Sequence, residues 1–217
     1  MTSDGLRTVR AWIGVHAGRP ALVLLAVSGL LSLLSAQAMI SSLGFLVFET
    51  PVSLLLLVPV LAGIGVGMGT ENTARIPLPE PLRLLAARLV WLLALTAAAG
   101  VAVSVGQLAG PAVDWQACLR NLLVHAALTV LAVTLVGSAT AWVPSVALTL
   151  LCMFFGYPPS KPGYYWWAAV MEETVSPTQW AGTTALFLLA ALVHVLHPRA
   201  APHAGRFPLR QRPTANG

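Results

Sequence analysis

Few side chains in this 217-residue chain are of types that could do chemistry, and their spacing matches no catalytic or metal site. His125 is the ionisable residue deepest in an apolar segment, where such residues are often functional. We favour the plainer alternative, a neutral imidazole hydrogen-bonded to a neighbouring helix. Cys118 and Cys152 lack metal-ligand spacing and are predicted to be free buried thiols. We therefore expect no catalytic group, cofactor or metal ion on this chain.

Four glycines alternate at the end of the second apolar segment: Gly63, Gly65, Gly67 and Gly69. A nucleotide-binding glycine loop follows a strand and opens a helix, so this run fails that test. The spacing of four residues, Gly63 to Gly67 and Gly65 to Gly69, instead predicts close packing against another helix. That helix belongs either to this chain or to a second subunit.

The segment 70–87, TENTARIPLPEPLRLLAA, is a polar joint between two apolar segments. We expect Thr70 to cap a short helix in which Glu71 and Arg75 pair at i, i+4, and three prolines then prevent a long helix. In the alternative reading, the arginines only set orientation in the membrane. The residues of this elbow expected to make contacts are Glu71, Asn72, Thr73, Arg75 and Glu80.

A second polar joint, 158–177, reads PPSKPGYYWWAAVMEETVSP and is rich in aromatic residues. Such rings are typical of the headgroup level of a membrane, so an aromatic belt is the simpler interpretation. A sharper one is a short interfacial helix over 164–171 that closes the outer mouth of a pathway, with Glu172 and Glu173 facing water. The candidate pathway or gate residues are then His125, Tyr164, Trp166, Glu172 and Glu173.

These joints must be positioned by long apolar segments. The chain is 57% hydrophobic and 9% charged, with a mean hydropathy of +0.80, which excludes ordinary globular and disordered classes. About 20 apolar residues make a helix that crosses a bilayer. We predict an all-α membrane protein with six spans, at 21–43, 51–69, 84–106, 118–137, 142–157 and 178–197.

The distribution of basic residues orients these spans. With the N-terminus in the cytoplasm, ten of the twelve Lys and Arg residues fall inside, and only Arg120 and Lys161 fall outside. Both termini are therefore predicted to be cytoplasmic. The basic residues cluster beside apolar segments, so a membrane explains them better than nucleic acid does, and no nucleic-acid partner is expected.

Residues 1–19 have a helical pattern with one apolar side, and Arg7 and Arg10 lie on another side from Trp12. We predict a helix lying along the inner membrane surface. The domain division is thus 1–19 as a cytoplasmic amphipathic helix, 20–197 as the six-span domain, and 198–217 as a basic cytoplasmic tail.

This layout resembles one family, the permease subunit of ABC exporters with the type V architecture, of the antibiotic and multidrug type found in actinobacteria. The resemblance covers nearly the whole chain, but it is one of layout. Only the elbow, TENTARIPLPEPLRLLAARL, looks like a sequence pattern of the family.

The resemblance implies that 1–19, with Arg7, Arg10 and Trp12, is the connecting helix and that Glu71 to Arg75 is the coupling helix. Both would dock on a separate ATPase subunit. This chain would lie in the bacterial cytoplasmic membrane, where two permease subunits, identical or related, would enclose the pathway among membrane lipids. The sequence contains no GxxxxGK[ST] motif, so ATP and Mg would bind the ATPase partner, and this chain is not expected to be an enzyme. A hydrophobic or amphipathic cargo is expected.

Two other functions stay open. One is a non-transporting accessory, immunity or sensor protein that binds a lipid or a hydrophobic peptide. The other is a proton-coupled carrier, which would need His125 to titrate within the membrane, although intramembrane charge is scarce.

Overall fold

The computed structural model describes residues 18–43, 46–71, 82–110, 113–158 and 163–197. The predicted N-terminal helix (save its last two residues), most of the elbow and the basic tail lie outside these ranges. The described residues are mostly helical. Its elements are α2 (Gly18–Leu34), β1 (Met39–Leu43), β2 (Leu46–Ser53), η1 (Leu54–Leu56), α3 (Val58–Gly69), α4 (Leu82–Ser104), η2 (Val105–Ala109), α5 (Trp115–Leu135), η3 (Ser138–Thr140), α6 (Val143–Phe155), η4 (Trp166–Met171) and α7 (Pro177–Leu196).

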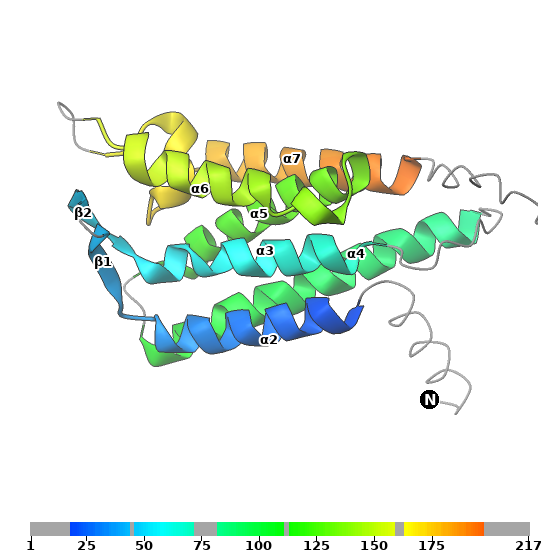
Figure 1. The fold of residues 1–217 in the computed structure, drawn as a ribbon, viewed down its shortest axis with the longest axis horizontal. Helices are drawn as coiled ribbons and strands as arrows, with labels where there is room; N and C mark the ends of the chain where they lie inside the picture. Colours follow the sequence, from blue (N-terminus) through cyan, green and yellow to red (C-terminus); the bar gives the residue numbers. More distant parts are fainter. Residues whose placement is uncertain (1–17, 44–45, 72–81, 111–112, 159–162, 198–217) are drawn as a thin grey trace, which may run out of the picture.

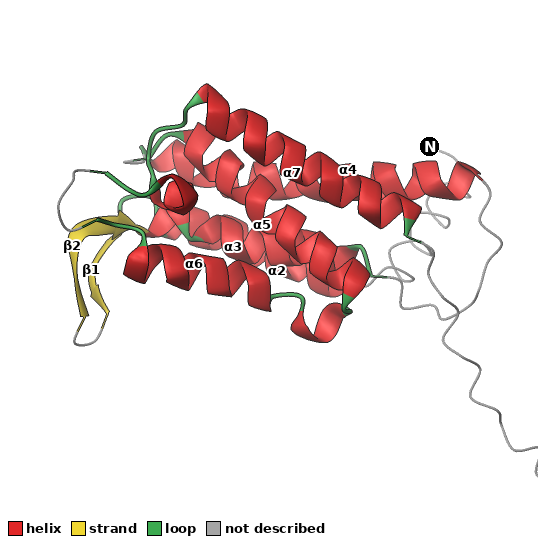
Figure 2. Ribbon diagram, turned by 90° about the horizontal axis from the view of Figure 1, so that it is seen from above, coloured by secondary structure: helices red, strands yellow, loops and turns green. Residues whose placement is uncertain are grey.

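The helices form a bundle in which successive helices run in alternate directions (Figure 1). One end of the bundle carries the β1–β2 hairpin, the start of α5 and η4, and we call it the hairpin end. The opposite end carries the start of α2, the end of α3, the start of α4 and the end of α7, and we call it the termini end. Figure 2 shows the hairpin projecting beyond the helices.

Four helical segments of the described chain are long and apolar enough to cross a membrane: Leu85–Ala109, Trp115–Leu135, Ser138–Phe155 and Pro177–Leu196. Two shorter apolar helical segments, Gly18–Leu34 and Leu54–Gly69, accompany them. Many large apolar side chains face outward, including Leu30, Val90 and Leu192. An outward apolar surface on long helices is what a lipid environment selects, so the fold indicates a membrane protein.

The hairpin corrects the all-α prediction and the bounds of the first two predicted spans. The helix predicted over 21–43 ends at Leu34, and Met39–Leu43 pairs antiparallel with Leu46–Ser53. The second span was predicted from residue 51, but its helical part begins at Leu54. Apolar runs rich in Val, Ile and Phe suit a strand as well as a helix, and the cross-strand pairing satisfies the backbone groups here. The other four predicted spans agree with α4 to α7 within a few residues.

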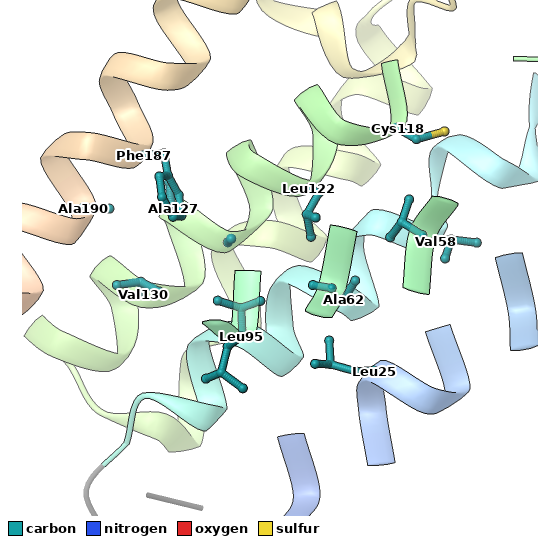
Figure 3. Close-up of a cluster of buried hydrophobic side chains, with 14 of the residues drawn as sticks. Leu25, Val58, Ala62, Leu95, Cys118, Leu122, Ala127, Val130, Phe187 and Ala190 are labelled. Carbon is teal, nitrogen blue, oxygen red and sulfur yellow. The ribbon is translucent and has the colours of Figure 1, made fainter. Parts of the chain in front are cut away.

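The apolar core runs along α3 and α5, which the other helices surround (Figure 3). It includes Leu25 from α2, Ala62 from α3, Leu95 from α4, Leu122 from α5 and Phe187 from α7. Nearly every residue of α3 is buried, although its glycines are poor helix formers. The packing that encloses α3 therefore offsets the low helix propensity of its sequence.

Candidate functional site

Two of the four alternating glycines form the contact between α3 and α5. A Cβ atom at Gly63 would lie 2.6 Å from the Cβ of His125, and one at Gly67 would lie 2.3 Å from Cγ2 of Thr129. Both distances are far inside van der Waals contact, so only glycine lets the two backbones approach this closely. The helix that packs against Gly63 and Gly67 is therefore α5 of the same chain rather than a helix of a second subunit.

The other pair faces the opposite side of α3. A Cβ at Gly65 would lie 3.2 Å from the Cβ of Leu24 in α2. At Gly69 it would lie 2.9 Å from the Cβ of Ala21 and 2.6 Å from Cδ1 of Leu95 in α4. The alternation of the two pairs thus lets α3 pack closely on both sides at once, which explains its central place in the bundle.

Arg120, which the sequence marked only as an exception to the charge bias, lies near the start of α5 and is 1% exposed. Its Nη2 donates to the carbonyl of Glu172 (2.7 Å), and its Nη1 donates to the carbonyl of Thr174 (3.2 Å) and to Oε1 of Gln179 (3.1 Å). Its Nε donates to Oδ1 of Asn121 (3.1 Å). Buried cations need such partners, and hydrogen bonds to a charged group contribute about 1.5–3 kcal/mol each.

Asn121 and Gln179 extend this network. Asn121 Nδ2 donates to the carbonyls of Val170 (2.7 Å) and Leu56 (3.2 Å). Gln179 Nε2 donates to Oε2 of Glu172, and Gln179 also completes a capping box with Ser176 at the start of α7. We call Arg120, Asn121, Glu172 and Gln179 the anchor cluster. It joins η1, α5, η4, the chain after η4 and α7 at the hairpin end.

The anchor cluster changes the interpretation of the acidic pair after η4. Glu173 is exposed, as predicted, but Glu172 is half-buried and binds Gln179 through its carboxylate and Arg120 through its carbonyl. It therefore does not simply face water. The signal available in the sequence was Arg120 itself, a basic residue inside a predicted span and an exception to the charge bias.

A second cluster of polar residues lies nearer the middle of the bundle, between α5 and α6. Thr129 Oγ1 and Ser145 Oγ are 3.0 Å apart, and both contact the carbonyl of His125, at 2.8 and 3.3 Å. Thr149 Oγ1 donates to the carbonyl of Ser145 (2.9 Å). We call His125, Thr129, Ser145 and Thr149 the polar seam.

His125 is 1% exposed, and its Nδ1 atom is buried without a hydrogen-bond partner. The favoured sequence interpretation, an imidazole bonded to a neighbouring helix, is therefore wrong for this nitrogen. A buried polar group without a partner costs about 1–3 kcal/mol, and native structures keep few of them. This orphan nitrogen marks the polar seam as the candidate functional site.

The described end of the elbow contacts the bundle. Thr70 ends α3 and its Oγ1 donates to the carbonyl of Gly67 (2.6 Å), while Glu71 Oε1 accepts a hydrogen bond from Ser138 Oγ (2.6 Å) in η3. The short helix expected after Thr70, with Asn72, Thr73, Arg75 and Glu80, lies outside the described residues. So do Arg7, Arg10 and Trp12.

The aromatic segment contains the short helix η4, which begins at Trp166 and is a 3₁₀ helix. It matches in part the helix over 164–171 of the sharper interpretation. Trp166 is 87% exposed, and the rings of Tyr165 and Trp167 are stacked at 6.0 Å. The ring of Tyr164 meets that of Tyr157 edge-on at 5.6 Å. Exposed aromatic rings at one end of an apolar bundle are typical of a membrane interface.

Among the described residues, no group of three or more His, Cys, Asp or Glu side chains is placed to hold a metal ion. No family model, curated protein or solved structure matches the chain.

Proposed function

We propose that this chain is the permease subunit of an ATP-driven ABC exporter of type V architecture, which moves a hydrophobic or amphipathic molecule out across the bacterial cytoplasmic membrane. The proposal is supported mainly by where the connections between the helices lie. The start of α2, the end of α3, the start of α4 and the end of α7 share the termini end, while η4 lies at the other (Figure 1). A permease needs its contacts with the ATPase on one side and its outer mouth on the other.

The proposal includes six spans with both termini in the cytoplasm. The helix α2 has 17 residues and is about 25 Å long at 1.5 Å per residue, slightly less than a hydrocarbon core of about 30 Å. Local thinning of the bilayer accommodates a short span of this kind. The positive-inside bias then places the termini end in the cytoplasm.

The contacts of α6 provide a route from the elbow to the outer segment. At the termini end, Glu71 bonds Ser138, which lies just before α6. At the hairpin end, the amide of Tyr165 donates to the carbonyl of Gly156, just after α6 (2.8 Å), and the Ala168 side chain sits against Gly156. A push on the elbow by two closing ATPase subunits would therefore move α6 and η4 together.

ATP and Mg would bind a P-loop ATPase partner, and a second permease chain, identical or related, would complete the pathway. The experiment that tests the function is purification of the tagged chain from its native membrane in mild detergent, with mass spectrometry of the copurifying proteins. A stoichiometric P-loop ATPase is expected. If the chain emerges alone even after gentle crosslinking, the accessory or lipid-binding function replaces this one.

The coupling route has its own test in the reconstituted complex. Ser138→Ala removes the contact with Glu71 and is expected to lower transport per ATP hydrolysed, with the ATPase still bound. Thr140→Ala, an exposed position in the same turn, is the matched control and should transport normally. Equal coupling in both variants would remove the Glu71–Ser138 contact from the mechanism.

A further inference from the structure

The helix α6 buries small side chains and exposes large ones. Its buried residues are Ser145, Thr149 and Cys152, whereas Leu150, Leu151, Phe154 and Phe155 are among its exposed ones. The buried three follow helical spacing and therefore form one stripe. This stripe is what α6 presents to the rest of the bundle.

The facing stripe on α5 is polar as well. His125 and Thr129 are four residues apart and share one face of the helix. The two helices run in opposite directions, and Thr129 lies opposite Ser145. Moving one turn along each helix brings His125 to the level of Thr149. The α5 stripe meets α3 at Gly63 and Gly67 and meets α6 at Ser145, so the two polar stripes adjoin where the three helices come together.

Neither wall of this contact supplies a partner for His125 Nδ1. On the α3 side, Gly63 sits directly against the Cβ of His125 and has no side chain to offer. On the α6 side, Thr149 Oγ1 already donates its proton to the Ser145 carbonyl, as Thr129 Oγ1 does to the His125 carbonyl. The hydroxyl oxygens thus remain as acceptors, and so does Nδ1 when the neutral imidazole carries its proton on Nε2.

We propose that the polar seam is an intramembrane binding site for the hydroxyl or ammonium group of an amphipathic molecule. The group donates to His125 Nδ1 and to the oxygens of Ser145 and Thr149, while its apolar body lies along the outward face of α6. The proposal takes the tautomer with the proton on Nε2, in which Nδ1 and the hydroxyl oxygens are all acceptors and a donor completes them. This inference deepens the proposed function by naming the chemistry of the cargo, and it rests on that function only for the direction of movement.

Access to the seam requires α6 to separate from α5. The hydrogen bonds between them come from the hydroxyl groups of Thr129 and Ser145, and hydrogen bonds between membrane helices are individually weak. The ligand replaces the bonds that are broken. The α3 side of the seam stays in place because Gly63 and Gly67 hold α3 directly against α5.

The test uses the purified full-length chain in lipid nanodiscs of phosphatidylethanolamine and phosphatidylglycerol. The probes are hexadecylamine and hexadecanol, each with a photoreactive diazirine beside the polar group, and a hexadecane diazirine without a polar group. We expect the two polar probes to label 121–129 and 143–155 saturably, with competition by unlabelled hexadecylamine. Polar and apolar probes that label the same positions equally would overturn the proposal, because the seam would then not recognise a hydrogen-bond donor.

Three variants make the test specific. Thr149→Val keeps the shape of the side chain, and His125→Leu removes the imidazole. Each substitution alone should weaken labelling about tenfold, as expected for the loss of one hydrogen bond in a dry site. Thr96→Val is the matched control, because Thr96 Oγ1 makes the same local bond to Leu92 (2.9 Å) on α4, away from the seam. Unchanged labelling in both seam variants would also overturn the proposal. The labelling needs no ATPase, so the binding-site proposal can fail or succeed separately from the proposed function.

Discussion

The anchor cluster and the polar seam lie one helical turn apart on α5, and both are buried among helices. In the anchor cluster, Arg120 and Asn121 donate to carbonyls of η1, η4 and the chain after η4, and to a side chain of α7. In the seam, His125 Nδ1 has no partner. The two clusters therefore share a helix and a degree of burial but differ in how completely their hydrogen bonds are made.

This difference separates structural polar groups from functional ones. A buried group with all its partners stabilises one arrangement, and its removal leaves those partners unsatisfied. A buried group without a partner already lowers stability, so it persists where another molecule completes it. The anchor cluster should thus matter for folding and the seam for binding, and the following variants test that contrast.

The largest effect is expected from Arg120→Leu. The substitution removes four hydrogen bonds and leaves the Glu172 and Thr174 carbonyls and Gln179 without their buried donor, so the free energy of unfolding should fall by about 4 kcal/mol. Unfolding in mixed micelles of mild detergent and SDS measures it. Arg19→Met, at an exposed arginine, should change little. A loss for Arg120→Leu no larger than for the control would contradict the structural role of the anchor cluster.

Gly63→Ala tests the wall behind the seam. The added methyl group would lie 2.7 Å from the backbone nitrogen of Ala126, which cannot move aside as a side chain could, so we expect a loss of about 3 kcal/mol. Gly182→Ala is the control, because Gly182 lies in α7 with no atom within 4 Å of the added Cβ. The better helix propensity of alanine should make that control neutral or stabilising. Similar unfolding curves for the two variants would mean that α3 and α5 are not held in close contact.

Asn121→Leu and His125→Leu compare the two clusters most directly. Asn121→Leu leaves the carbonyls of Leu56 and Val170 without a donor and should lower the free energy of unfolding by about 2 kcal/mol. His125→Leu removes a nitrogen that has no partner, so stability should stay equal or rise. The same detergent unfolding experiment measures both. A greater loss for His125→Leu than for Asn121→Leu would reverse the assignment of the two clusters.

The sequence predicted the helices well and the hairpin not at all, for a physical reason. A long apolar segment such as the one that forms α7 must satisfy its own backbone hydrogen bonds within a bilayer, and a helix does so. The run after Ser35 is apolar too, but Met39–Leu43 and Leu46–Ser53 satisfy each other's backbone groups by pairing. Hydropathy measures the preference for an apolar environment and contains nothing about which backbone bonds are made.

The candidate site was predicted only in part. His125 stood out because an ionisable residue in an apolar segment is visible in sequence, and the glycine pairs stood out by their spacing. The partners of Arg120 could not be predicted, because Thr174 and Gln179 lie 54 and 59 residues away in the chain. Whether His125 Nδ1 has a partner depends on the same long-range packing, which one sequence does not reveal.

The smallest effect concerns the bond that closes the seam. In a double-mutant cycle of Thr129→Val and Ser145→Ala, the coupling energy should be about 0.6 kcal/mol, the average for hydrogen bonds between membrane helices. Thr96→Val combined with Ser145→Ala should give no coupling, since Thr96 lies on α4. A coupling energy above about 2 kcal/mol would be well beyond the range measured for such bonds. It would mean that α6 is fixed to α5, and a fixed α6 could neither admit a ligand to His125 nor transmit a push from the elbow to η4.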